Sequence, residues 1–222
     1  MRRDRGDLLT IGVLAAIAGA GAWGVRRGGR NAEIDGQIDR ALELVPELVL
    51  QWVNHAEDSA LQDPGEVEDF YLSDMMDRPS RATLAWWKQE TGLTYIGHGN
   101  QRVAFRLSDG SVLKLALDHV GEESNELEME TWQEAQGDPD VLDLLVPMLA
   151  GNERFIHMAG ADPLSATRLQ GDPRLAERFR ERFRVANTLA HEGRLVATDL
   201  AVPKNWGIHE GRIKILDYEA GQ

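Results

Sequence analysis

The sequence contains no cysteine among its 222 residues, which excludes disulfide bonds, thiolate metal sites and a cysteine nucleophile. Lysine is scarce, because only four of the 24 basic residues are lysines. Acidic residues number 37, so the net charge of the chain is -13. An acidic chain is a poor match for the phosphate backbone of nucleic acid. We therefore expect no nucleic-acid partner.

Long apolar runs are also scarce, and one alone approaches the length of a membrane span. Residues 8–25 carry no charge and are flanked by three arginines on each side. As a helix this run would measure roughly 27 Å, close to the thickness of a hydrocarbon core. We therefore expect residues 1–30 to anchor the chain in a membrane, with the remaining domain in the cytoplasm. A cleaved signal peptide and a non-membrane tail stay open as alternatives, the tail for a cytoplasmic or virion protein.

Residues 31–92 have the pattern of a helical extension with a linker. Apolar residues at spacings of three and four predict an amphipathic helix over 32–57, which Pro46 should kink or interrupt. The stretch 57–80 is rich in Asp, Glu, Pro and Ser, which is typical of a linker. A second helix is predicted over 79–91. Two helices should therefore precede the rest of the fold.

The pattern changes after residue 92, where short apolar runs alternate with turn residues. These runs predict strands at 93–96, 102–107, 111–117, 143–149, 154–158, 207–208 and 212–216. Helical periodicity predicts helices over about 123–136 and over 173–191. Residues 93–222 should therefore form one α+β domain with an antiparallel sheet.

Several polar residues and glycines stand at marked points of this pattern. Lys114 interrupts an apolar strand, Glu128 lies on the helix that follows, and Asp217 ends the last apolar strand. A Gly-x-Gly turn occupies 97–99, and a loop with Asp and Asn at its ends occupies 199–205. Taken in this order, the elements resemble the protein-kinase-like fold, especially its small viral and microbial members.

The resemblance implies both an architecture and a function. The antiparallel N-lobe sheet, with one key helix, would lie within 93–160, and a reduced helical C-lobe would lie within 161–222. The chain would bind ATP and Mg²⁺ and act as a phosphotransferase on an unknown protein or small-molecule acceptor.

The resemblance also assigns residues to the nucleotide. Gly97 and Gly99 would form the glycine-rich loop, whose main chain approaches the phosphates. Lys114 would contact the α- and β-phosphates, and Glu128 would pair with it to hold the ammonium extended. Met158 would end the strand that leads into the hinge, where main-chain groups bind adenine.

Three further residues would complete a catalytic site by the same resemblance. Asn205 and Asp217 would hold Mg²⁺, because their oxygen atoms suit that ion. Asp199 would act as the base that orients the attacking hydroxyl.

The sequence also departs from the family pattern. Arg102 stands where the third glycine is usual, and residues 196–198 lack the usual His-Arg. The spacing from Asp199 to Asn205 is one residue longer than is usual in the family. These departures keep a second hypothesis open, that of a pseudokinase or a kinase-fold interaction protein without catalysis, possibly viral. A third hypothesis is a membrane-anchored α+β interaction protein without a ligand.

Overall fold

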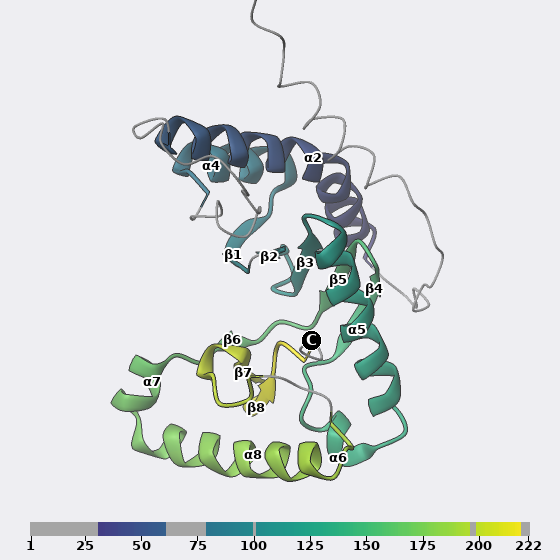
Figure 1. Cartoon of the computed structure of the whole chain (residues 1–222), viewed down its shortest axis with the longest axis vertical. Coiled ribbons are helices and arrows are strands. Elements are labelled where there is room, and N and C mark those ends of the chain that lie inside the picture. The colour runs from purple at the N-terminus through teal and green to yellow at the C-terminus, as the bar shows by residue number, and fades with distance from the viewer. Residues whose placement is uncertain (1–30, 61–78, 100, 196–198, 219–222) are drawn as a thin grey trace, which may run out of the picture.

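The computed structural model describes residues 31–60, 79–99, 101–195 and 199–218 (Figure 1). The membrane segment predicted at 8–25 and most of the linker predicted at 57–80 lie outside these residues. Within the described part of the chain, no helix is both long enough and apolar enough to cross a membrane.

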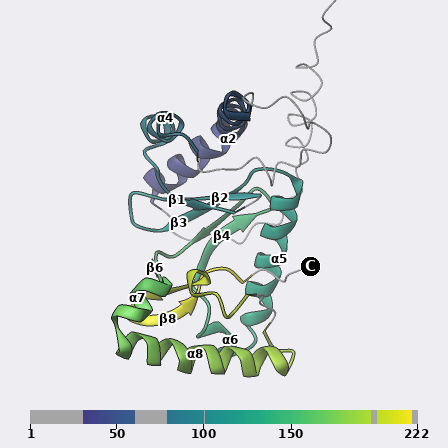
Figure 2. The same cartoon turned by 60° about the vertical axis from the view of Figure 1, so that its left-hand side comes forward.

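Both helices predicted before residue 92 are present, as α2 (Ala32–Ala60) and α4 (Arg81–Thr91). The hydroxyl of Ser80 accepts the N–H of Thr83 and so caps the start of α4. Gly92, with φ of 74°, ends the helix in the left-handed conformation that glycine favours. The two helices pack together on one side of the molecule (Figure 2).

Helix α2 runs through Pro46 without a break, and Figure 1 shows that it bends along its length, in keeping with the predicted kink. Proline lacks the N–H that would bind the main-chain oxygen four residues earlier, which here belongs to Leu42. That oxygen instead accepts a hydrogen bond of 3.2 Å from Nη2 of Arg154. A contact from far along the chain therefore satisfies the acceptor that proline leaves open, and the helix continues.

A five-stranded sheet, antiparallel throughout, has the order β1-β2-β3-β5-β4. Its strands are β1 (Thr94–His98), β2 (Arg102–Arg106), β3 (Val112–Ala116), β4 (Met148–Asn152) and β5 (Phe155–Met158). The α+β class and the antiparallel sheet predicted from the sequence are confirmed.

Two strands differ from their predicted bounds by two residues or more at one or both ends, and the others differ by one residue. Gly97 lies within β1 and not in a turn, because it pairs with Ala104 of the next strand. The strand predicted at 143–149 begins only at Met148. Before it, Asp138 accepts main-chain N–H groups and starts a short helix, α6 (Pro139–Leu142). The turn that ends α6 takes Asp143 and Leu144, and Leu145 forms only an isolated bridge with Ile215, so the strand starts later than the apolar pattern predicts.

The sheet has two different faces because side chains alternate along each strand. Lys114 pairs with Ile156, so these two residues share one face, which we call the Lys114 face. Phe105 pairs with Leu113 on the opposite face, where both are fully buried beneath α2 and α4. Trp87 of α4 stacks on Phe105 there, with ring centroids 4.8 Å apart.

Helix α5 (His119–Ala135) contacts β3, β4 and β5. It begins earlier than the predicted residue 123, because Asp118 accepts the N–H of Gly121 and caps an additional turn. The start of α5 packs closely on the β1–β2 hairpin. A Cβ atom on Gly121 would lie only 2.3 Å from the main-chain oxygen of Gln101.

The C-terminal half holds a three-stranded sheet in the order β6-β7-β8. Its elements are β6 (Asp162–Pro163), α7 (Ala166–Gly171), α8 (Pro173–His191), the 3-10 helix η1 (Pro203–Asn205), β7 (Trp206–His209) and β8 (Arg212–Ile215). The bounds of α8 agree with the predicted helix, whereas β6 and α7 were not predicted. Leu175, Ala186 and Leu189 form the buried face of α8.

Figure 1 shows the five-stranded sheet with α2 and α4 above it, and the three-stranded sheet with α8 below. Residues 159–161 connect the two halves. One apolar core runs between them and includes Met129 of α5, Ile156 of β5, Leu189 of α8 and Ile215 of β8. The Lys114 face of the upper sheet therefore packs toward the C-terminal half.

Candidate functional site

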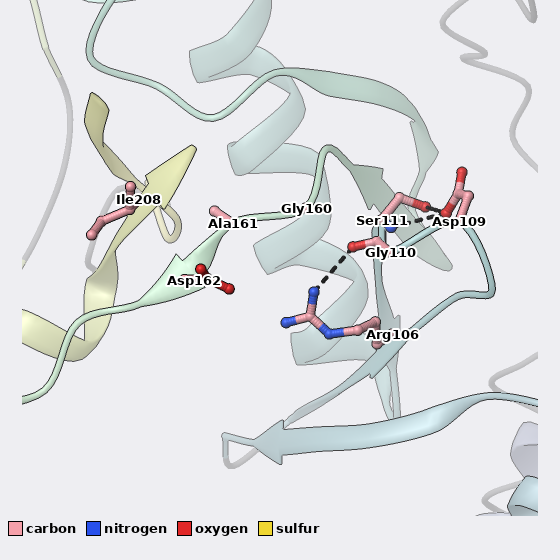
Figure 3. Close-up of a pocket in the computed structure, with 8 residues that line it drawn as sticks. All are labelled: Arg106, Asp109, Gly110, Ser111, Gly160, Ala161, Asp162 and Ile208. Carbon is pink, nitrogen blue, oxygen red and sulfur yellow. Dashed lines mark hydrogen bonds between the residues drawn. The ribbon is translucent and has the colours of Figure 1, made fainter. Parts of the chain in front are cut away.

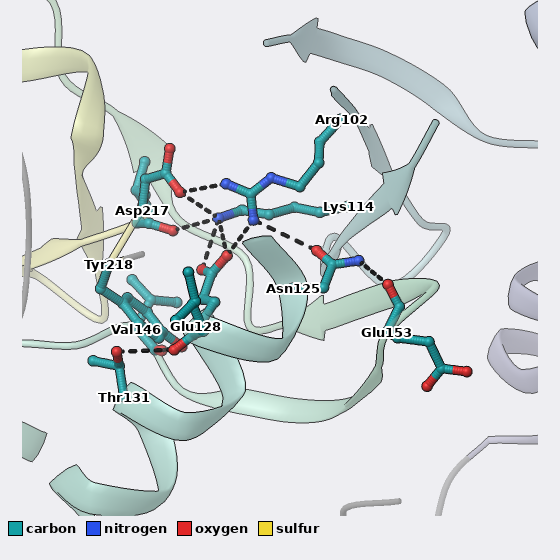
Figure 4. Close-up of polar contacts among 11 residues, drawn as sticks. Arg102, Lys114, Asn125, Glu128, Thr131, Val146, Glu153, Asp217 and Tyr218 are labelled. Atoms are coloured by element: carbon teal, nitrogen blue, oxygen red, sulfur yellow. Dashed lines mark hydrogen bonds and ion pairs between the residues drawn. The ribbon is translucent and has the colours of Figure 1, made fainter. Parts of the chain in front are cut away.

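Four charged side chains from four separate segments meet on the Lys114 face (Figure 4). Arg102 comes from β2, Lys114 from β3 and Glu128 from α5. Asp217 follows β8 near the end of the described chain. We call these four residues the charge cluster.

The predicted ion pair between Lys114 and Glu128 is present in the charge cluster. Nζ of Lys114 lies 2.8 Å from Oε1 and 3.0 Å from Oε2 of Glu128. The Glu128 side chain is fully buried, and that of Lys114 is 12% exposed. A buried carboxylate needs a charged or hydrogen-bonding partner. The two contacts in turn hold the ammonium group extended at a single position.

Asp217 is the second carboxylate of the cluster. Its Oδ1 lies 3.2 Å from Nζ of Lys114, which also donates to the main-chain oxygen of Leu216 at 3.0 Å. The positive charge of Lys114 is the main reason that the pKa of Asp217 falls from 3.8 to about 2. Burial opposes this shift, and Arg102 adds to it. Asp217 is therefore ionised at neutral pH, although 38% of its side chain is exposed.

Arg102 completes the cluster, and the sequence did not predict it as a site residue. Its Nη1 lies 2.7 Å from Oε2 of Glu128, and its Nη2 lies 2.9 Å from Oδ1 of Asp217. Arg102 pairs with Ala116, two residues from Lys114 and on the same face. The sequence signal that could have located it is an arginine on the neighbouring predicted strand, at a position whose side chain would share a face of the sheet with Lys114.

Two buried polar residues support the cluster. Nδ2 of Asn125 donates to the main-chain oxygen of Glu153 at 2.9 Å, which leaves its Oδ1 facing the arginine of the cluster. The hydroxyl of Tyr218 donates to the main-chain oxygen of Val146 at 3.3 Å. Burial and the two nearby carboxylates raise the pKa of Tyr218 well above its ordinary value. Tyr218 is therefore neutral and anchors the chain beside Asp217.

The loop 199–205 lies beside the segment that carries Asp217. The main-chain oxygen of Asn205 accepts the N–H of Leu216 at 2.7 Å, and its Nδ2 donates to the main-chain oxygen of Asp199 at 3.3 Å. Asp199 is exposed, with a left-handed φ of 54°. Folding thus brings Asn205 next to the residue before Asp217, whereas the carboxylate of Asp199 stays outside the charge cluster.

Gly97 lies near the end of β1, and Gly99 lies in the connection from β1 to β2. Gly97 pairs with Ala104, and the N–H of Gly99 donates to the main-chain oxygen of Arg102 at 2.9 Å. A Cβ atom on either glycine would meet no described atom within 4 Å. The space beside the hairpin is therefore open, and close packing does not explain these glycines.

Met158 lies at the end of β5 with only 2% of its surface exposed. It pairs with Val112 on one side and with Met148 on the other. Its side chain belongs to the core and its main chain to the sheet. Contacts from this segment to a ligand would therefore come from residues 159–161.

A cavity of about 330 Å³ lies at another part of the Lys114 face (Figure 3). It is found where the turn between β2 and β3 meets the connection to β6. The residues that line it are Arg106, Asp109, Gly110, Ser111, Gly160, Ala161, Asp162 and Ile208. Arg106 pairs with Val112, which is two residues before Lys114, so both side chains lie on the Lys114 face. The cavity and the charge cluster therefore lie along one face of the sheet.

Asp217, one of the two residues expected to hold magnesium, already contacts two cations. Mg²⁺ binds oxygen atoms in a strict octahedral geometry. Oδ1 of Asp217 already lies against the cations Arg102 and Lys114, which a divalent ion would have to displace. In the parts of the chain that the structure covers, no group of three or more His, Asp or Glu side chains could hold a metal ion.

Three of the residues predicted for the site therefore meet in the charge cluster, namely Lys114, Glu128 and Asp217. Asn205 lies beside the cluster, and Asp199 and Met158 lie outside it. No protein-family model matches the sequence, and no curated protein matches it.

Proposed function

We propose that this chain is a protein-kinase-like protein that binds ATP between its two halves. The observation that carries the proposal is the convergence of Lys114, a fully buried Glu128, and Asp217 from the C-terminal half. Kinase-like sites need a lysine that is held in place for the phosphates by a glutamate, with an acidic residue beside it. These three residues supply that set.

The burial of the charges favours a binding role over a purely structural one. Removing an ion pair from water is costly, and apolar residues in place of a buried pair are often neutral or stabilising. Arg102 and Lys114 nevertheless lie in the interior, each with 12% of its side chain exposed. Two cations fixed where water is largely excluded are suited to an anionic ligand such as phosphate.

The cavity offers room for the nucleoside. Its volume of about 330 Å³ lies within the range of small-molecule sites, about 300–1,000 Å³. Ser111 of the cavity lies three residues from Lys114, which at the rise of a strand amounts to roughly 10 Å. This separation suits an extended nucleotide, with its base in the cavity and its outer phosphates at the charge cluster.

Phosphoryl transfer to an acceptor hydroxyl is the fuller form of this proposal. Transfer depends mainly on positioning the acceptor and neutralising charge on the phosphates. Asp199 is the candidate to orient the hydroxyl of a protein or small-molecule acceptor. Its loop is joined to the segment of Asp217 through the hydrogen bond between Asn205 and Leu216, and its exposed carboxylate is accessible to such an acceptor.

A pseudokinase is the second candidate, and a specific observation favours it. Asp199 lies outside the charge cluster, while the carboxylate of Asp217 is engaged by both cations. In this form, nucleotide would stabilise the packing of the two halves for a protein partner, and no transfer would occur.

Thermal unfolding of the full-length chain with ATP, in the presence and absence of Mg²⁺, tests the proposed function. A ligand at about 100 times its Kd stabilises the native state by about 2.7 kcal/mol, so the midpoint of unfolding should rise. Lys114→Ala should abolish the rise. Lys88→Ala is the matched control, because Lys88 is exposed on α4.

An unchanged midpoint in the wild type under both conditions would reject ATP binding and leave an α+β interaction protein without a nucleotide. If ATP binds, incubation with labelled ATP and a panel of protein and small-molecule acceptors separates the two candidates. Labelled acceptor indicates a phosphotransferase, and binding without transfer indicates a pseudokinase.

A further inference from the structure

We propose that the guanidinium group of Arg102 takes the place of a divalent cation, so that the site binds the phosphates of a nucleotide without a metal ion. This inference rests on the proposed nucleotide-binding function and concerns how the same site neutralises its ligand. It differs from the expectation that Asn205 and Asp217 hold magnesium.

The position of Arg102 supports the inference. Its Nη1 and Nη2 lie 2.7 Å from Glu128 and 2.9 Å from Asp217, so that the guanidinium bridges the two carboxylates (Figure 4). Lys114 contacts the same two carboxylates from the neighbouring strand. A positive group between acidic side chains, where a phosphate ligand would enter, is the arrangement that a metal ion otherwise provides.

The charges of the cluster lead to the same conclusion. Among the residues that the structure describes, the two cations of the cluster balance its two carboxylates, so these four side chains carry no excess of negative charge to attract Mg²⁺. A divalent ion at Asp217 would also be repelled by Arg102 and Lys114, which both approach its Oδ1. The site as built therefore favours an anion over a cation, once one internal carboxylate moves aside.

Asp217 is the carboxylate that can move. Its side chain is 38% exposed, whereas that of Glu128 is fully buried and is held by both cations. A phosphate group could replace Asp217 as the acceptor for Nη2 of Arg102 and Nζ of Lys114. Glu128 would meanwhile keep both cations in place. Arginine suits this exchange because its planar fork binds phosphate through two parallel N–H groups.

Calorimetric titration of the full-length chain with ATP tests the inference, once in EDTA and once with excess Mg²⁺. We expect dissociation constants that agree within about threefold. Binding with Mg²⁺ that weakens more than about tenfold in EDTA would overturn the role of Arg102 and leave the proposed function standing. Absence of binding under both conditions would overturn both.

Substitution of Arg102 gives the second measurement. Arg102→Gln keeps much of the length of the side chain but removes its charge, and should weaken binding in EDTA roughly ten- to hundredfold. Arg102→Lys should retain part of the affinity. Arg180→Gln is the control, because Arg180 is exposed on α8 and pairs there with Glu177. Unchanged metal-free affinity in a folded Arg102→Gln variant would overturn the inference.

Asp217→Asn separates the two models by the direction of its effect, and it tests the inference even if the Arg102 variants do not fold. If Asp217 competes with phosphate for the two cations, removing its charge should increase ATP affinity in EDTA. If Asp217 is a magnesium ligand, the same change should weaken binding of Mg-ATP. Weaker binding with Mg²⁺ and no gain in EDTA would overturn the inference.

Discussion

The main-chain N–H of Leu216 donates a hydrogen bond of 2.7 Å to the main-chain oxygen of Asn205. Nζ of Lys114 donates to the main-chain oxygen of the same Leu216 at 3.0 Å. Strand β3 of the N-terminal half and the loop that carries Asp199 are therefore linked through one residue, next to Asp217. A ligand that shifts Lys114 should also affect the position of this loop.

Glu128→Gln should lower the stability of the fold substantially. The change leaves Arg102 and Lys114 in the interior with one carboxylate between them, and breaking a buried ion pair typically costs about 3–5 kcal/mol. Urea denaturation measures the loss. Glu126→Gln is the matched control, because Glu126 is exposed on the same helix. Similar losses in both variants would mean that the charge cluster contributes little to stability.

Acid should destabilise the wild type more steeply than Asp217→Asn. The pKa of Asp217 is lower in the folded chain than its ordinary value, so its ionised form stabilises the fold above pH 3.8. This contribution is lost as the pH falls from 3.8 through about 2, where Asp217 takes up a proton in the folded state. Denaturation midpoints measured between about pH 5 and pH 2 test this. Parallel curves for the two proteins would contradict it.

Gly121→Ala and Gly36→Ala should have opposite effects on stability. A Cβ atom on Gly121 would lie 2.3 Å from a main-chain oxygen of the β1–β2 hairpin, so α5 or the hairpin must move, at about 1–3 kcal/mol. Gly36 lies in α2, where no atom of the described residues lies within 4 Å of an added Cβ, and alanine there should add about 0.5–1 kcal/mol to the stability. Thermal or urea unfolding compares the two, and a stabilised Gly121→Ala would show that the hairpin can yield.

Asp199→Asn should abolish any phosphoryl transfer without weakening ATP binding. Asparagine is chosen because it tolerates the left-handed φ of 54° at this position. The side chain would contact the acceptor and not the phosphates. Transfer of labelled phosphate and ATP titration are measured on the same preparation. Equal transfer by the variant and the wild type would remove Asp199 from the mechanism.

The full-length chain should sediment with membranes, whereas a chain that begins at residue 31 should stay in the supernatant. Residues 8–25 supply the one uncharged run of near-spanning length in the sequence. Fractionation in the absence of detergent, with a carbonate wash to remove peripheral proteins, gives the measurement. Recovery of the intact full-length chain in the supernatant would favour the non-membrane tail.

Local pattern in the sequence was sufficient to predict several elements. Helix α8 has its predicted bounds because its apolar residues recur at helical spacing after a capping Asp172. The strand predicted around Lys114 is present, and the partner that the resemblance to the protein-kinase-like fold assigned to this lysine, Glu128, does pair with it. These features depend on residues close together in the chain, because a helix cap and a regular spacing of apolar residues are both visible within a short stretch of sequence.

Only the tertiary structure decided how distant segments meet. Pro46 continues its helix because Arg154 reaches the oxygen of Leu42, a contact that no local pattern reveals. Arg102 joins the charge cluster because the register between β2 and β3 puts its side chain on the same face of the sheet as Lys114. The segment after β8 brings Asp217 to that same face. The register of the strands and the path of the segment after β8 both depend on packing between elements that are far apart in the sequence. The sequence therefore determined which charged residues are available, and folding determined that Arg102 lies between Glu128 and Asp217.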